Sequence, residues 1–285
     1  MALTVNTNVT SLSVQKNLNR SSDALSTSMT RLSSGLKINS AKDDAAGLQI
    51  ATRMTSQIRG QTMAIKNAND GISIAQTAEG AMQEQTNILQ RMRELALQSV
   101  NDSNSQLDRD ALDKEFKAMI SEIGRIADST QLNGKNLLDG SAGKMVFQVG
   151  SNTGTQNQIS IDMSKGLSSA TSGALSALAT QTISGAVSSD AQATFSAAMS
   201  AIDSALDTIN GVRADLGASQ NRLSSTISNL QNINENAEAA RGRVQDTDFA
   251  AETAQLTKQQ TLQQASTAVL AQANQLPSAV LKLLQ

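Results

Sequence analysis

Residues that could carry out chemistry are scarce in this chain of 285 residues. It contains no Cys and no His, which excludes a thiol nucleophile, an imidazole base, a Ser-His-Asp triad and a zinc site of ordinary ligands. Carboxylates remain, and pairs of them could catalyse hydrolysis or hold Mg²⁺ or Ca²⁺. The only adjacent acids are Asp43 and Asp44, and a Ser-x-x-Asp capping box starting at Ser40 explains them. We therefore predict no enzyme activity, no cofactor and no metal.

Charge and hydropathy exclude two further classes of partner. The formal net charge is −2, which offers no basic face to nucleic acid or to anionic lipid. No apolar run is long enough to cross a bilayer, and residues 1–17 lack the basic start and continuous apolar stretch of a cleavable secretory signal. We predict neither nucleic acid nor membrane as a partner, and export from the cell, if it occurs, by another route.

Two seven-residue repeats indicate the elements that this chain must form, which are long helices. One repeat consists of Phe195, Ile202, Ile209, Leu216, Leu223, Leu230, Ala237 and Val244, and the other of Ala68, Ala75, Met82, Leu89 and Ala96. On a helix, the first repeat forms an apolar stripe roughly 75 Å long, at about 1.5 Å per residue, and only a rod-like partner can cover it. A third amphipathic segment, 112–126, follows a capping box at Ser105. We predict a mainly α fold, an elongated antiparallel helical bundle or coiled coil, with its seam at Ile202, Ile209, Leu216, Leu223 and Leu230.

Both ends of the chain are patterned as helices but carry almost no charge. Residues 1–15 have no charged side chain, and residues 259–285 have only Lys282. Isolated helices are marginal in water, and charge-poor apolar helices make a poor solvated surface. We predict that the two ends pair as helices and are buried by neighbouring copies, so that they mediate self-assembly. The residues concerned are Leu18, Leu25, Leu32, Leu262, Val269, Leu276 and Leu283.

The middle of the chain has a different pattern. Apolar residues alternate on both sides of a Gly/Asn/Thr-rich turn, which predicts a small β-hairpin at about 144–163. The Ser/Thr-rich stretch 164–190 follows, and we interpret it as an exposed loop. Two roles are open for it, a plain surface loop or a site of O-linked glycans. The candidate glycan acceptors are Ser168, Ser169, Thr171, Ser172, Thr180 and Ser188.

Several long motifs, in order along the chain, resemble those of bacterial flagellins. They are Asn6-Thr-Asn8, TRLSSGLKINSAKDDAAGLQIA at 30–51, QRMRELALQSVN at 90–101 and QASTAVLAQANQLPSAVLKLL at 264–284. The resemblance implies a structural subunit that polymerises into the extracellular flagellar filament and serves motility. It also implies an inner terminal helical domain, 1–42 with 243–285, and an outer bundle domain, 43–242, that includes the hairpin and the loop.

The same resemblance implies partners beyond other copies of the chain. These are the hook-associated junction and cap proteins, a flagellin export chaperone that binds the C-terminal segment, and the flagellar type III export apparatus. Arg91, Leu95 and Glu115 match positions that an animal innate immune receptor contacts, and 30–51 resembles the peptide detected by plant immune receptors. The alternative for all these positions is packing between subunits along the filament.

Three other identities compete with this one. A hook-filament junction protein of the same superfamily shares the terminal helices, but such proteins usually diverge from the Ala-Gln-Ala-Asn sequence at 271–274 and are larger in the middle. A flagellin with a metalloprotease insert needs His-Glu-x-x-His, which a chain without His cannot provide. A membrane-active translocator needs longer, unbroken apolar helices.

Overall fold

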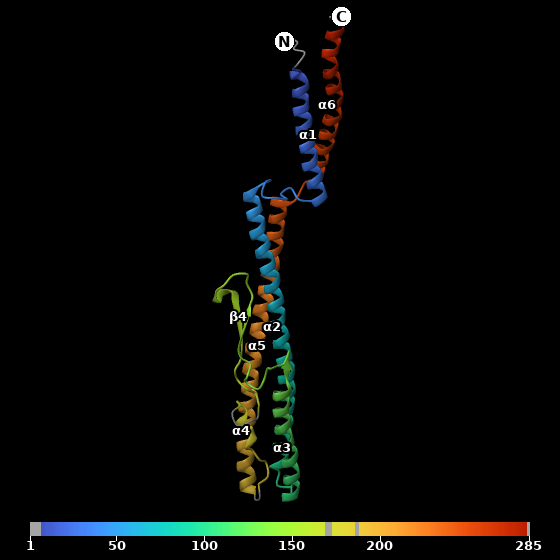
Figure 1. Cartoon of the computed structure of the whole chain (residues 1–285). Coiled ribbons are helices and arrows are strands. Elements are labelled where there is room, and N and C mark those ends of the chain that lie inside the picture. The colour runs from blue at the N-terminus through green and yellow to red at the C-terminus, as the bar shows by residue number, and fades with distance from the viewer. Residues whose placement is uncertain (1–6, 169–172, 186–187, 284–285) are drawn as a thin grey trace. The chain divides into compact units, whose positions relative to one another are not determined.

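The computed structural model describes residues 7–168, 173–185 and 188–283, with only the backbone described at 188–189 and 276–283. The chain divides into two compact units: the terminal unit, Met1–Ile58 with Glu235–Gln285, and the central unit, Arg59–Asn234. Two long helices, α2 (Ala45–Ser99) and α5 (Ser188–Gln245), contribute to both units (Figure 1).

The terminal unit contains an antiparallel pair of helices, α1 (Val9–Ser34) and α6 (Phe249–Leu283). The Asn8 side chain caps the start of α1 and also donates from Nδ2 to the Ala273 carbonyl oxygen at 2.8 Å. At the other end of α1, Arg31 Nη1 lies 3.8 Å from Oε2 of Glu252, a residue near the start of α6. These contacts join opposite ends of the two helices and confirm that the chain termini pair as helices.

The connection from α1 to α2 lies against the connection from α5 to α6. Gly35 ends α1 in the left-handed region, with φ 73°, and its carbonyl accepts from Thr247 N at 3.0 Å. Lys37 N donates to the Gln245 carbonyl at 2.7 Å. The two connections are therefore held together by backbone hydrogen bonds, which do not depend on side-chain identity.

The acidic pair in the first connection caps differently from the prediction. Asp43 Oδ2 accepts from the backbone N–H groups of Asn39 and Ser40, at 3.1 and 2.9 Å, and this closes a turn before the helix. These hydrogen bonds, chiefly that from Ser40, lower the pKa of Asp43. It is Asp44 that caps α2, accepting from Gly47 N at 2.9 Å. The predicted box at Ser40 therefore forms a turn, and the neighbouring acid starts the helix.

The central unit is a helical bundle with a hairpin and a short connecting segment. Its elements besides α2 and α5 are α3 (Gln106–Ser129), β1 (Gln131–Leu132), β2 (Lys135–Asn136), β3 (Gly143–Gln148), η1 (Thr155–Asn157), β4 (Gln158–Met163) and α4 (Ser176–Ala179). One continuous hydrophobic core joins α2, α3, α5 and the hairpin, with large side chains such as Met82, Phe116 and Ile123 completely buried. The capping box predicted at Ser105 is present, with Asp108 as its second member.

The predicted hairpin is confirmed as the antiparallel pair β3 and β4. Its register places Met145 opposite Ile161 and Phe147 opposite Ile159. Gly71 on α2 makes close packing possible, because a Cβ there would lie 3.3 Å from the Phe147 ring and 3.2 Å from Leu223 Cδ1 on α5. The bare backbone of α2 thus lets the hairpin and α5 approach the same point.

The sequence did not lead us to expect the small hairpin β1–β2. Asn133 and Gly134 have φ of 52° and 74°, the conformation of a two-residue type I′ turn. Asn-Gly is the strongest short hairpin signal, but the flanking strands are only two residues each, too short to show alternation.

The Ser/Thr-rich stretch is not the plain exposed loop that composition suggested. Within its described part, four apolar side chains are almost fully buried: Leu167, Leu175, Leu178 and Ile183. Their spacing follows neither a helical nor a strand period, so the hydroxyl-rich composition concealed them. The segment is a strap that closes one side of the core.

Candidate assembly surfaces

The face that α1 and α6 turn toward each other is built from small and polar side chains. We call it the terminal seam, and its buried members are Ser11, Ser21, Ser28, Gln259 and Ala273, each 3–9% exposed. Ser11 Oγ donates to Asn274 Oδ1 at 2.9 Å. Among the described side chains of the two helices, Ala273 is the only buried hydrophobic one. The buried positions of the pair are therefore mostly polar, and its described leucines are at most partly buried by this contact.

Large apolar side chains of the same two helices point to solvent instead. They are 42–69% exposed, and they extend over most of the described length of the pair. We call these residues the exposed apolar set: Val9, Leu12, Met29, Phe249, Leu262 and Val269. An exposed apolar surface of this extent on a soluble chain marks an interaction site.

The residues predicted to mediate self-assembly fall into three groups. Leu18, Leu25 and Leu32 are half-buried, because they lie three or four residues from Ser21 and Ser28, on the side of α1 that faces α6. Leu262 and Val269 are exposed and available to another molecule. The side chains of Leu276 and Leu283 lie outside the described residues. The predicted stripe on α1 is therefore partly used within the chain, whereas the described part of the stripe on α6 is not.

The five residues predicted to form the bundle seam all lie in buried positions of the central unit. Ile202, Ile209, Leu216, Leu223 and Leu230 are 0–7% exposed. The facing repeat on α2, from Ala68 to Ala96, is completely buried. Three of its five residues are alanines, which leave room for the large side chains of α5 to pack closely.

The three residues matched to immune-receptor contacts have different environments. Arg91 on α2 and Glu115 on α3 are exposed and form an ion pair at 3.2 Å, with Glu94 also 2.9 Å from Arg91. Leu95 is completely buried in the core. A receptor could contact the charged pair directly, but Leu95 could contribute only by supporting the surface.

Two of the six candidate glycan acceptors have described side chains, and they differ in accessibility. Ser168 is buried and therefore inaccessible in the folded chain, whereas Thr180 is exposed. Ser169, Thr171 and Ser172 lie outside the described residues, as does the side chain of Ser188. Thr180 is the remaining candidate with a described, accessible hydroxyl.

A cluster of charged residues that we did not predict holds the strap to α3. Asp113, which is buried, accepts from Thr182 Oγ1 at 2.7 Å, Ile183 N at 2.8 Å and Lys117 Nζ at 2.5 Å. Burial alone would raise the pKa of Asp113, but these hydrogen bonds together lower it. Buried Arg109 donates to the Gly185 carbonyl at 3.3 Å. No sequence signal revealed these residues, because their partners on the strap are 69 or more positions away in an irregular segment.

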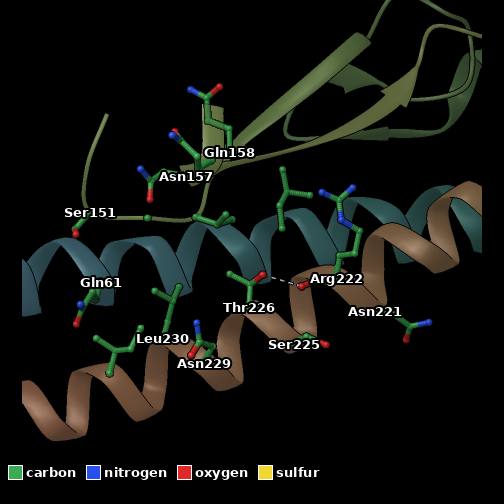
Figure 2. A pocket seen from close by; sticks show the side chains of 15 residues that line it. Gln61, Ser151, Asn157, Gln158, Asn221, Arg222, Ser225, Thr226, Asn229 and Leu230 are labelled. Atoms are coloured by element: carbon green, nitrogen blue, oxygen red, sulfur yellow. Dashed lines mark hydrogen bonds between the residues drawn. The ribbon is translucent and has the colours of Figure 1, made fainter. Parts of the chain in front are cut away.

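The central unit also has a polar pocket of about 650 Å³ between the hairpin turn, α2 and α5 (Figure 2). We call it the amide pocket, because six of its lining side chains are carboxamides: Gln61, Gln156, Asn157, Gln158, Asn221 and Asn229. Arg222 is its one charged residue, and Leu230 and Ile233 contribute apolar surface. Hydroxyl groups of Ser151, Ser225 and Thr226 also line the pocket, but its lining residues include no general base that could activate them.

The described residues provide neither a membrane span nor a metal site. Over this part of the chain, no helix combines the length and apolarity needed to span a bilayer. The same residues include no group of three or more carboxylates close enough to hold a metal ion.

Comparison with known proteins links these surfaces to one family. The bacterial flagellin N-terminal helical region matches residues 5–143, and the C-terminal helical region matches 199–284. Flagellin A of Vibrio anguillarum is 41% identical over 379 aligned positions and flagellin B of Vibrio cholerae is 41% identical over 375, each alignment covering 100% of both chains. A putative flagellar hook-associated protein from Vibrio parahaemolyticus shares the fold, with a TM-score of 0.58 and 15% identity over 72% of this chain and 100% of that one.

Proposed function

The chain belongs to the bacterial flagellin family, and on that premise we propose that α1 and α6 form the surface through which its copies polymerise. Flagellins are structural, non-enzymatic subunits of the extracellular flagellar filament, and this chain is such a subunit. The relatives at 41% identity are flagellins, and the likeness to a hook-associated protein, at 15% identity, concerns the fold alone. A hook-filament junction protein is therefore not the better supported identity.

The arrangement of side chains on the terminal pair is the observation that supports this assembly surface most directly. The buried positions of its own seam are small or polar, the leucines beside them are half-buried, and the exposed apolar set faces solvent. Burying a Val, Leu, Phe or Met side chain stabilises by roughly 1.5–3 kcal/mol. Several such burials per copy can offset the entropy lost when helices are ordered and docked, whereas within a single chain the exposed apolar set contributes none of that gain.

The same observation supports the two layers that the family resemblance implies. We propose 1–42 with 243–285 as the inner, assembling layer and 43–242 as the outer bundle. Among the described residues, the inner layer has the six exposed large apolar residues of the exposed apolar set, and six others are spread over the much longer outer layer, which contains the whole continuous hydrophobic core. These boundaries lie close to the two connections, the one between α1 and α2 and the one between α5 and α6.

Partners other than the chain itself are proposed on a narrower basis. The exposed Leu262 and Val269 are the kind of surface that an export chaperone would cover before passage through a type III apparatus, and that junction and cap proteins would meet at the filament ends. The exposed pair Arg91 and Glu115 is a feasible contact for a host innate immune receptor. Thr180 is the accessible acceptor that we propose for an O-linked glycan.

Seeded polymerisation tests the assembly surface. We expect L262D and V269D to lose elongation from wild-type filament seeds, because each places a charge where neighbouring copies bury an apolar side chain. A118D, at an exposed position of α3, is the matched control and should elongate normally. Elongation of L262D and V269D at the wild-type rate, measured by sedimentation and electron microscopy, would contradict the proposal.

A further inference from the structure

The amide pocket contains a buried carboxamide that the chain itself leaves unpaired. Gln61 is nine-tenths buried, and its Oε1 has no hydrogen-bond partner among the described residues. It lines the pocket from α2, near Leu230 on α5 and Ser151 in the hairpin turn (Figure 2). A carboxamide that no hydrogen bond holds can turn either its carbonyl or its amino group toward a ligand. Because a buried carbonyl without a donor is costly, a ligand that brings an O–H or N–H group supplies what the folded chain lacks.

The one charged side chain of the pocket is a guanidinium without an acidic partner. Arg222 points from α5 toward the hairpin and forms no ion pair within the described part of the chain (Figure 2). The residues that line the pocket include no Asp or Glu, although the chain as a whole has a net charge of −2. A free guanidinium binds a carboxylate with two parallel hydrogen bonds. Its single positive charge balances one carboxylate, whereas a phosphate group, with a charge of about −2, would stay partly uncompensated.

The other groups in the pocket match a ligand that carries several hydroxyls. Six carboxamides and three hydroxyl groups line it. Each carboxamide offers both a donor and an acceptor, as each hydroxyl of a sugar does, so the two kinds of group can pair reciprocally. Leu230 and Ile233 add a small apolar surface, which suits the C–H face of a sugar ring. An apolar ligand would leave the polar groups unpaired, and a carboxylate as small as acetate would fill little of the roughly 650 Å³.

The hairpin side of the amide pocket is fixed by contacts within the chain. Asn67 Nδ2 on α2 donates to the Gln148 carbonyl at 3.0 Å, which ties β3 to the helix. Gln158 Nε2 donates across the hairpin to Gln148 Oε1 at 3.3 Å, which orients one of the lining carboxamides. Gly60 lets the hairpin turn approach α2, because a Cβ there would lie 2.9 Å from Ser151 Cβ. A preformed site loses little entropy when a ligand binds.

We propose that the amide pocket binds a hexuronate, a sugar ring with one carboxylate, as a free sugar or as a unit of an acidic polysaccharide. The carboxylate pairs with Arg222, and the ring hydroxyls bind the carboxamides, Gln61 among them. The C–H face of the ring lies on Leu230 and Ile233. Every lining residue belongs to the central unit, so binding of the sugar is a function separate from polymerisation through the terminal helices.

Titration of the full-length, unpolymerised subunit with D-galacturonate tests the site, by saturation-transfer NMR and calorimetry. D-galactose is the matched probe, because it differs only at C6, where a hydroxymethyl group replaces the carboxylate. We expect galacturonate to bind about tenfold more tightly than galactose, since only galacturonate pairs with the guanidinium. Trigalacturonate distinguishes the two sources of the ligand. Tighter binding of the trimer than of the single sugar indicates a polysaccharide unit, and equal binding indicates a free sugar.

Two variants assign the binding to this pocket, and thermal melts check that each is folded. R222Q, at an exposed side chain, should remove the preference for galacturonate over galactose, and Q61L should weaken binding of galacturonate about fivefold. R125Q on α3 and Q83L on α2, both at exposed positions, are the matched controls and should bind like wild type. Wild-type protein that does not bind galacturonate, or R222Q that keeps the preference, would overturn the proposal. Seeded polymerisation, and with it the proposed function, would stand in either case.

Discussion

The two ends of the chain and its centre solve the same packing problem in opposite ways. In the central unit, large residues such as Leu223, Phe116 and Met82 face inward and are completely buried. In the terminal pair, the buried positions include Ser21 and Ser28, leucines are only half-buried, and the exposed apolar set faces solvent. The central unit therefore has the core of a domain that is stable alone. The terminal pair leaves large apolar residues uncovered, which is why we propose that other copies of the subunit stabilise it.

Replacing Leu223 by Asp should produce the largest effect, because Leu223 is completely buried in the core of the central unit. The substitution places an unpaired charge against α2 and the hairpin and should lower the free energy of unfolding by about 3–5 kcal/mol. Far-UV circular dichroism during thermal and urea unfolding measures it. S224D, at the next and exposed position, carries the same charge and should melt like wild type. Similar melts for the two variants would show that the seam is not buried.

Deleting residues 264–285 should abolish filaments and leave the central unit intact. The deletion removes Val269 from the exposed apolar set and Ala273 from the terminal seam, but no residue of the hydrophobic core. Elongation of wild-type seeds should fall to zero, while the main thermal transition keeps its midpoint. Filaments assembled from the truncated chain, or a lost main transition, would show that the two regions are not independent in this way.

The fold was largely predictable because its central features are periodic. Seven-residue spacing identified Ile202, Ile209, Leu216 and Leu223 as a buried stripe, and the alternation around Phe147 predicted the hairpin. Such patterns reflect the repeat of the helix or strand itself, so they can be recognised without knowing which segment packs against it.

The features that escaped prediction have no period or carry the wrong polarity. Ser21, Ser28 and Gln259 are polar, so nothing in the sequence indicated that they, and not leucines alone, would face the partner helix. The strap is irregular, and its attachment to Asp113 joins segments about 70 positions apart. The amide pocket depends on the mutual placement of three elements, which sequence spacing does not provide.

The attachment of the strap to Asp113 should make the stability of the central unit depend on pH. The folded pKa of Asp113 is lowered, so its hydrogen bonds stabilise the fold fully above the unfolded value, roughly 3.9, and this stabilisation is lost as pH falls through the lower folded pKa. D113N should cost about 1–3 kcal/mol at neutral pH and flatten the acid limb of stability. D128N, an exposed acid on the same helix, is the control, and urea unfolding from pH 2 to pH 7 is the measurement. An acid limb of unchanged slope in D113N would assign that limb to other carboxylates.

Substituting two glycines of α2, one on its solvent side and one on its core-facing side, should change the free energy of unfolding by smaller amounts and in opposite directions. Gly80 is exposed, and no atom lies within 4 Å of the position that an alanine Cβ would take, so G80A adds helix propensity without a clash. It should raise the free energy of unfolding by about 0.5–1 kcal/mol. G71A gains the same propensity, but its methyl meets Leu223 and Phe147 at 3.2–3.3 Å in a packed core, and the crowding should exceed that gain. Opposite signs in urea unfolding are therefore expected, and stabilisation by both substitutions would mean that the hairpin and α5 can move away from α2.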